Sequence, residues 1–314
     1  MSRRVCLCVM GVLCATALAV PAAQAQTSAA KQQEKPKSRE EMSFEEIIPL
    51  AAVYQLPGMD KVEVRKNISY KTVDGKALHA DIYLPPGLKP GARRPAVIFV
   101  AGGMDPRFEP RPKDWGIYIS YGRLAAASGL VGVTFDHRLG YPRRQYEEGA
   151  SDLADLIGFL RKNAAEIRID PDRIGVVVYS GGGPMLSPLL REPPAYVRCL
   201  AGMYPFLDTH HVDPEEAQTP VEVIRKYSPL VALEGQSGPL PPVFIARAGR
   251  DSIPGVNESI ARFMQVALEK NLAVEFFNHP TGAHGFDQRN DDARSRTIIR
   301  ELLRFLKENL AAEK

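Results

Sequence analysis

Cysteine is scarce in this sequence, and its placement leaves little scope for disulfide bonds. Only four of the 314 residues are cysteines, and three of them lie in an N-terminal segment that we expect to be removed (Cys6, Cys8 and Cys14). The remaining Cys199 cannot form an internal disulfide on its own. We therefore expect the hydrophobic core to stabilise the chain, and we expect Cys199 to pack in a buried strand.

The sequence also lacks a strong excess of charge of either sign. Lys and Arg number 40 and Asp and Glu 37, which gives a formal net charge of +3. Proteins that bind nucleic acid usually carry a basic patch, and no cluster of basic residues interleaved with aromatic residues occurs here. The composition therefore predicts no nucleic-acid partner.

A spaced set of metal-ligating residues is missing as well. His210 and His211 lie close in sequence to Asp208 and Asp213. Adjacent histidine side chains rarely converge on one ion, however, and no further ligands occur at suitable spacing. We interpret these four residues as a polar surface. The sequence predicts neither a metal nor another cofactor.

Long apolar runs are absent except near the N-terminus. Residues 5–20 are apolar and uncharged, follow an Arg-Arg pair, and end at Pro21 shortly before Ala-Gln-Ala at 23–25. These three regions are typical of a secretory signal peptide. A single membrane anchor is the alternative, but a span needs about 20 apolar residues. We predict a signal peptide at residues 1–25, export to the periplasm or the medium, and no stable membrane insertion after cleavage.

The remaining chain divides into a linker and one domain. Residues 26–43 are rich in Gln, Lys, Ser and Ala, which is typical of a flexible linker. Within residues 44–314, continuous apolar runs alternate with segments of helical periodicity. The strand-like runs are 96–100, 130–135, 174–179, 197–203, 243–248 and 274–277, and the helix-like segments centre on 122–128, 153–160, 260–267 and 298–310. This alternation predicts an α/β domain whose mainly parallel sheet is covered by helices on both faces.

Two segments depart from this alternation. Residues 62–73 and 78–84 read as strands around the Asp74-Gly75 turn, which predicts an antiparallel hairpin at an edge of the sheet. Residues 205–240 contain Pro205, Pro214, Pro220 and Pro229 and end in Ser-Gly-Pro at 237–239. We interpret this segment as a small cap inserted over the strand ends, where such insertions usually line a site.

A serine followed by three glycines ends one of the buried strands. The run at 176–179 leads directly into Ser180 and then Gly181, Gly182 and Gly183. A nucleophilic serine on a sharp strand-to-helix turn needs small neighbours of this kind. A plain glycine-rich turn is the alternative, whereas a phosphate loop is disfavoured because no Lys-Ser/Thr follows the glycines.

Candidates for the partners of Ser180 follow two later strands. Asp251 follows the run at 243–248 after Gly249 and Arg250, at the strand end where parallel sheets place their sites. His284 lies between small residues in the loop after 274–277, and His279 on the same loop competes with it as a base. A histidine near its ordinary pKa can accept the serine proton, and an aspartate can hold its tautomer. We predict Ser180 as nucleophile, His284 as base and Asp251 as the orienting acid.

A glycine pair marks candidate donors for an oxyanion. Gly102 and Gly103 follow the strand-like run at 96–100. In α/β enzymes with a nucleophilic serine, the loop at this place supplies backbone N–H groups to the oxyanion. The residue after the nucleophile, Gly181, supplies another. A flexible turn is the alternative reading of such a pair.

These motifs resemble those of the α/β-hydrolase superfamily, and most closely its esterase and dienelactone-hydrolase-like branches. The resemblance extends from residue 68 to the C-terminus and is carried by residues 97–103, 135–139, 179–182, 249–251 and 283–286. It implies a triad of Ser180, Asp251 and His284, in the chain order of that superfamily. Together with the predicted signal peptide, it implies an exported carboxylesterase that acts on a small-molecule ester through an acyl-enzyme.

The sequence departs from the family pattern at two places. The usual first glycine of the Gly-x-Ser-x-Gly motif is Val178, and Ala101 replaces the histidine that many relatives carry before the glycine pair. A catalytically silent binding protein of this fold, or a peptidase or lipase with the same triad, are the alternatives. No feature of the sequence indicates an oligomeric state.

Overall fold

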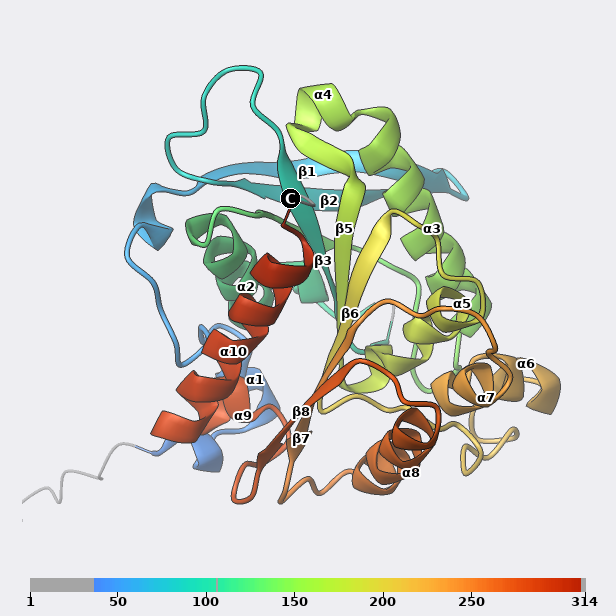
Figure 1. Ribbon diagram of the computed structural model, residues 1–314. Helices are drawn as coiled ribbons and strands as arrows, with labels where there is room; N and C mark the ends of the chain where they lie inside the picture. The colour runs from blue at the N-terminus through green and yellow to red at the C-terminus, as the bar shows by residue number, and fades with distance from the viewer. Residues whose placement is uncertain (1–36, 106, 312–314) are drawn as a thin grey trace, which may run out of the picture. The chain divides into compact units, whose positions relative to one another are not determined.

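The computed structural model describes residues 37–105 and 107–311 (Figure 1). The predicted signal peptide and most of the predicted linker lie outside these residues. An eight-stranded sheet runs through the described domain in the order β1-β2-β4-β3-β5-β6-β7-β8. The strands are β1 (Glu63–Val73), β2 (Lys76–Leu84), β3 (Arg94–Val100), β4 (Val131–Phe135), β5 (Ile169–Tyr179), β6 (Val197–Met203), β7 (Val243–Ala248) and β8 (Val274–His279).

The predicted α/β class and the edge hairpin are confirmed. β1 and β2 pair antiparallel around Asp74 and Gly75, which both have positive φ, as a tight hairpin turn requires. β2 joins β4 in antiparallel register, and all pairs from β4 through β8 are parallel. The chain adds strands on opposite sides of β3, so the carboxyl ends of β3 and β5 form a switch point where a crevice is expected.

Helices cover both faces of this sheet (Figure 1). The helices are α1 (Phe44–Ile47), α2 (Gly116–Ala127), α3 (Tyr146–Lys162), α4 (Ala164–Ile167), α5 (Leu186–Arg191), α6 (Val221–Lys226), α7 (Pro229–Glu234), α8 (Val256–Glu269), α9 (Phe286–Arg289) and α10 (Ala293–Asn309). Four short 3-10 turns complete the domain: η1 (Arg39–Glu41), η2 (Met59–Lys61), η3 (Pro112–Asp114) and η4 (Ser180–Met185).

The alternation of side chains along β5 shows how both faces are buried. Val176 and Val178 pack into the core beneath α3, α5 and α8, whereas Val177 and Tyr179 pack on the opposite face beneath α2 and α10. None of these four residues is more than 1% exposed. A strand that is buried on both faces is a continuous run of apolar residues in the sequence, and this strand could be predicted for that reason.

Several elements, including β2, β3, α2 and β5, begin earlier than the sequence indicated. α2 begins at Gly116 rather than near residue 122, because the amide of Gly116 donates to the carbonyl of Ile48 at 2.8 Å and a side chain there would collide with Pro49. β5 begins at Ile169, and a register shift between Ile174 and Gly175 separates its first part from the buried run.

The segment at 205–240 contributes to the domain core as well as to its surface. It contains α6 and α7, and α7 packs against α5 and α8. Leu207, Ile224 and Leu233 are buried in the same core as α3. The predicted cap is therefore anchored by its own apolar residues over one end of the sheet.

The last residues of the predicted linker are attached to the domain. Arg39 donates hydrogen bonds to the carbonyls of Ala51 and Gln288, at 3.1 and 3.0 Å. The side chain of Asn290 also donates to Glu40. In the described ranges, no helix is both long and apolar enough to span a bilayer.

Candidate active site

Ser180 lies on a strained turn at the end of β5. Its φ of 51° is in the left-handed region, which non-glycine residues rarely adopt and which costs about 1–2 kcal/mol. Strain of this kind is a recurring feature of functional sites. The side chain is thereby lifted from the sheet and stays partly exposed, while Tyr179 before it is buried.

Glycines make this turn sterically feasible. A Cβ on Gly183 would lie 2.0 Å from the carbonyl oxygen of Phe206, and one on Gly182 would lie 2.8 Å from that of Ala101. Ser180 also accepts a backbone hydrogen bond from Phe206 at 2.9 Å, which fixes the turn to the segment after β6. The turn continues as the 3-10 turn η4, with Pro184 inside it, before α5 begins at Leu186.

Val178, where the family pattern has glycine, is completely buried in β5. Val178 pairs with Gly202 of β6, and both residues point to the same face of the sheet. A Cβ on Gly202 would itself lie 2.6 Å from the Pro205 ring.

The structure brings Ser180, His284 and Asp251 into one chain of hydrogen bonds. His284 Nε2 lies 2.8 Å from Ser180 Oγ, and His284 Nδ1 lies 2.7 Å from Asp251 Oδ2. The Asp251 side chain is fully buried, and that of His284 is 21% exposed. Because the carboxylate can only accept, Nδ1 donates to it, which leaves Nε2 to accept the serine proton.

The loops that carry the acid and the base are tied to each other. The amide of Arg250 donates to the carbonyl of Gly282 at 2.9 Å, and the amide of Gly249 donates to the carbonyl of His279 at 2.8 Å. Asp251 Oδ1 accepts the amide of Ile253 at 3.0 Å, so its second carboxylate oxygen is also satisfied. The imidazole is thus held by backbone contacts between β7 and the loop after β8.

His279, the alternative candidate for the base, does not lie beside Ser180. His279 is 1% exposed at the end of β8, and its Nε2 lies 3.0 Å from Ser295 Oγ and 3.2 Å from Asp292 Oδ1 at the start of α10. It forms no contact with Ser180. His279 therefore links β8 to α10, and of the two histidines only His284 meets the serine.

The three glycines of the candidate oxyanion site gather beside Ser180. A Cβ on Gly102 would lie 3.7 Å from Ser180 Cβ and 3.5 Å from the Gly181 amide nitrogen. A Cβ on Gly181 would lie 3.6 Å from the Gly103 amide nitrogen. The loop after β3 and the start of η4 thus face each other across a space that no side chain fills, as backbone donors to an oxyanion require.

A buried acidic group behind His284 is a feature that the sequence did not indicate. Asp287 is fully buried on α9 and accepts the hydroxyls of Tyr121 at 2.7 Å and Tyr204 at 2.9 Å. The Tyr204 ring packs edge-on against the His284 ring, with centroids 4.7 Å apart. Burial raises the pKa of Asp287, and the two tyrosine hydrogen bonds oppose that rise.

The polar residues near His210 are satisfied by each other. Asp208 Oδ2 lies 2.9 Å from Arg262 Nη1 and 2.5 Å from His210 Nδ1. Among the described residues, no group of three or more His, Cys, Asp or Glu is arranged to hold a metal ion. Arg262 and His210 therefore share the carboxylate of Asp208.

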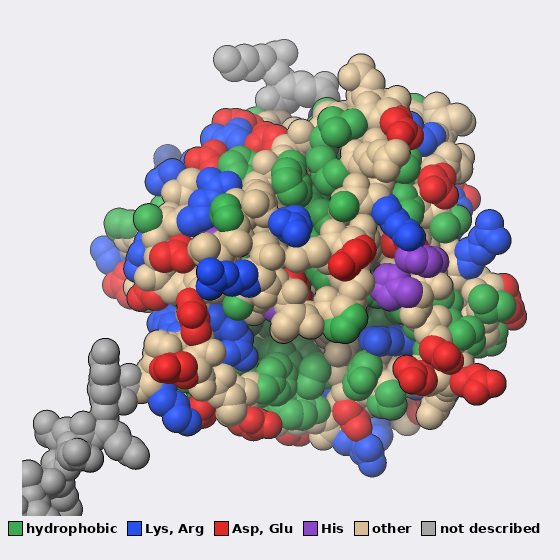
Figure 2. All heavy atoms as spheres, turned by 90° about the horizontal axis from the view of Figure 1, so that it is seen from below, with side chains coloured by type: hydrophobic (Ala, Val, Ile, Leu, Met, Phe, Trp, Pro, Cys, Tyr) green, Lys and Arg blue, Asp and Glu red, His purple; other side chains and the backbone are tan. Residues whose placement is uncertain are grey.

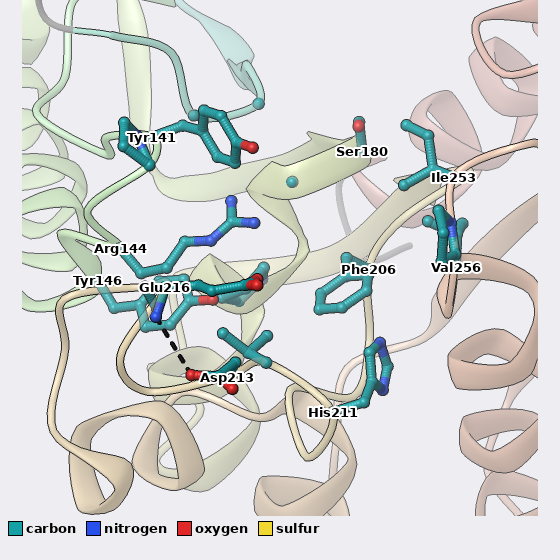
Figure 3. Close-up of a pocket in the computed structure, with 18 residues that line it drawn as sticks. Tyr141, Arg144, Tyr146, Ser180, Phe206, His211, Asp213, Glu216, Ile253 and Val256 are labelled. Carbon is teal, nitrogen blue, oxygen red and sulfur yellow. Dashed lines mark hydrogen bonds between the residues drawn. The ribbon is translucent and has the colours of Figure 1, made fainter.

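A cavity of about 760 Å³ opens beside Ser180. Figure 2 views the edge where the parallel strands end, and this face is visibly hollowed, with hydrophobic side chains inside and charged ones at the rim. The cavity is lined by Gly102, Gly103, Ser180 and Gly181 on one side and by residues of the 205–240 segment, including Phe206, on another (Figure 3). Trp115 and Tyr118 do not line it and pack against each other with ring centroids 6.1 Å apart.

Comparisons with known proteins find the same fold and a family match over part of the chain. The family model described as BD-FAE matches residues 80–190, which include the glycine pair and Ser180 and end before Asp251 and His284. Esterase 2 of the planctomycete Thermogutta terrifontis, in its native structure, is 23% identical with a TM-score of 0.64 and covers 82% of this chain and 96% of its own. Its paraoxon-phosphorylated structure is 24% identical, with a TM-score of 0.64 and coverages of 81% and 97%.

Two curated proteins match over shorter regions. The 5-methylorsellinic acid synthase of Aspergillus terreus is 31% identical in an alignment of 150 positions that covers 44% of this chain and 6% of the synthase. Mouse dipeptidyl peptidase 8 is 27% identical in an alignment of 165 positions that covers 46% of this chain and 18% of the peptidase. The match thus spans less than a fifth of either protein.

Proposed function

We propose that this chain is an α/β-hydrolase that hydrolyses small carboxylic esters with Ser180 as its nucleophile. The observation that carries the proposal is the continuous hydrogen-bond chain from Ser180 through His284 to Asp251, at 2.8 and 2.7 Å. Ser180 lines a cavity beside three glycines that can supply backbone N–H donors. The likeness to esterases in fold and in a family model supports the same reading.

The geometry supports an acyl-enzyme mechanism. As Ser180 Oγ attacks the ester carbonyl carbon, its proton passes to His284 Nε2, and Asp251 stabilises the imidazolium through Nδ1–H. The amides of Gly103 and Gly181 stabilise the negative charge that develops on the carbonyl oxygen. The carbon–oxygen bond to the alcohol then breaks, and the alcohol leaves with the proton from His284. Water attacks the acyl-enzyme in the same way, which releases the acid and restores Ser180.

The test is hydrolysis of p-nitrophenyl esters from acetate to octanoate. We expect the wild type to turn over at least the short esters, and Ser180→Ala to lose about a thousandfold or more in kcat, as for other triad serines. Ser151→Ala is a matched control, because it removes a hydroxyl from the exposed face of α3. Absence of ester hydrolysis by the wild type would contradict the proposal and favour a binding protein of the same fold.

The same triad would also serve a peptidase or a lipase. Peptide p-nitroanilides and emulsified triglycerides distinguish these activities from hydrolysis of small soluble esters. The proposal requires that kcat/KM be highest for the small esters.

We further propose that the protein is exported with residues 1–25 as a signal peptide. The basic, apolar and small-residue regions of that segment support the proposal. The mass of the protein recovered outside the cytoplasm should correspond to cleavage after Ala25. A full-length mass with Met1 retained would contradict it.

A further inference from the structure

The cavity beside Ser180 has two chemically different walls. Phe206, Ile253 and Val256 form an apolar wall, whereas Tyr141, Arg144 and Glu216 lie on another (Figure 3). In Figure 3 the Arg144 side chain extends into the space between Tyr141 and Glu216. A substrate with one apolar and one polar end would match these walls.

Arg144 is held firmly at its backbone and along its side chain. Its amide donates to the carbonyl of Ala217 at 2.9 Å, and its carbonyl accepts from Thr219 Oγ1 at 3.1 Å. Its guanidinium carbon lies 4.7 Å from the centroid of the Tyr141 ring. These contacts place the guanidinium against an aromatic face at low entropic cost.

The guanidinium of Arg144 has no anionic partner in the described part of the chain. Nearby arginines are paired differently: Arg143 with Glu148 at 3.4 Å, and Arg138 with Asp152 at 2.7 Å. No hydrogen bond or ion pair of the Arg144 side chain occurs within residues 37–105 and 107–311. A partly buried charge without a partner is costly unless a ligand supplies the counter-ion.

The two acidic residues that line the same cavity do not act as counter-ions to Arg144. Asp213 accepts the amides of Glu215 at 2.8 Å and Glu216 at 3.2 Å, so its carboxylate closes a turn of the cap. Glu216 is exposed, and its side chain forms no ion pair in the described ranges. Arg144, which is the less exposed and the better fixed of the two charges, therefore decides which substrate charge the wall favours.

We propose that the cavity selects esters that carry a carboxylate as a second functional group, and that Arg144 binds this carboxylate while Ser180 attacks the ester. This inference rests on the proposed ester hydrolysis. The planar fork of a guanidinium matches a carboxylate in a bidentate arrangement, which an ammonium cannot reproduce. The carbon chain between the two groups would lie along the apolar wall.

The test compares an anionic ester with its neutral counterpart. The p-nitrophenyl monoester of adipic acid carries the carboxylate on the acyl side, and the p-nitrophenyl ester of adipamic acid replaces that carboxylate with an amide. A second pair, 4-carboxyphenyl and 4-carbamoylphenyl butyrate, places the charge on the alcohol side. The pair with the larger anionic-to-neutral ratio of kcat/KM identifies the side that faces Arg144.

We expect Arg144→Gln to lower this ratio by about tenfold or more, mainly through KM, because a charge-assisted hydrogen bond is lost. Arg144→Lys should restore only part of it. Glu216→Gln should raise the ratio by removing a repulsive charge. Arg143→Gln is the matched control, because it removes the same charge from a neighbouring arginine that is already paired with Glu148.

An unchanged ratio for both ester pairs in Arg144→Gln would overturn the inference, while hydrolysis of the neutral esters would leave the proposed function intact. Failure of the wild type on every ester would contradict the proposed function instead. In that event, binding of adipate to the wild type and to Arg144→Gln, measured by calorimetry, decides the inference alone. Equal affinity of the two proteins for adipate would refute it.

Discussion

Asp287 and Tyr204 are the residues whose contribution follows least directly from the sequence. A fully buried carboxyl without a cation is costly unless it is hydrogen-bonded, and Tyr121 and Tyr204 supply those bonds. Tyr204 has a φ of 40°, so its backbone is strained in the position that places its ring against His284. We interpret the two residues as positioning residues for the imidazole.

We expect Asp287→Asn to lower kcat for ester hydrolysis by about tenfold with little change in KM. The substitution turns one carboxylate oxygen into an NH2 donor, which cannot accept its tyrosine hydroxyl, so the Tyr204 ring is held less well against His284. Tyr204→Phe removes only the hydroxyl, so it should lower kcat by less. The measurement is kcat and KM for a short p-nitrophenyl ester, and an unchanged kcat in both variants would show that these residues do not position the imidazole.

The candidate triad was accessible from the sequence because each of its residues follows a strand that is itself recognisable. Asp287 and Arg144 were not, because their roles depend on tertiary contacts. Tyr121 lies 166 residues from Asp287 in sequence, and Tyr204 lies 83 residues from it. A residue pattern does not show that such distant hydroxyls converge on one carboxyl.

At the scale of secondary-structure elements, the nucleophile turn depends on its contact with the segment after β6. Gly183 faces the carbonyl of Phe206, and Phe206 lines the cavity. Any side chain at residue 183 must displace the backbone that forms one cavity wall. A change in the turn at Gly183 therefore also moves the cavity wall at Phe206.

We expect Gly183→Ala to lower the free energy of unfolding by about 1–3 kcal/mol or more and to reduce ester hydrolysis, because the added methyl group overpacks the turn. Gly158→Ala is the matched control, since a Cβ there would meet nothing within 4 Å. On the exposed face of α3, that change should be neutral or stabilising by about 1 kcal/mol. Chemical denaturation of both variants checks this, and equal stability would contradict the contact.

Element boundaries were predicted less well than element types. Continuous apolar runs located β3 through β7 because burial on both faces leaves a strong signal, whereas the edge strand β8 is only partly buried. The early start of α2 depends on a contact between Gly116 and the segment at residues 48–50, which periodicity does not report. The prolines of residues 205–240 allowed the cap to be predicted. They gave no indication that the same segment also contributes buried residues to the core.

For the molecule as a whole, the buried titratable groups decide how stability depends on pH. His137 is 4% exposed, and burial, followed by the charge of Arg111, lowers its pKa to about 4. In the unfolded chain a histidine titrates near 6.5. Between these values the unfolded state binds a proton that the native state does not bind, so acid favours unfolding.

We therefore expect the free energy of unfolding to fall as pH decreases from about 6.5 to about 4, with no further contribution from His137 below that range. His137→Phe keeps a ring of similar size and cannot titrate, so the slope in this window should become smaller. Urea unfolding at several pH values provides the measurement. The slope is the decisive quantity, because the variant can change absolute stability by repacking alone; an identical slope would contradict the assignment.

The most direct test of Ser180 as an activated nucleophile is covalent labelling with a p-nitrophenyl alkylphosphonate, followed by intact-mass measurement and peptide mapping. We expect the wild type to gain one phosphonyl group on Ser180 with release of one equivalent of p-nitrophenol, and Ser180→Ala to gain none. A wild-type protein that stays unlabelled, or that carries the label on another residue, would contradict the proposed serine hydrolase.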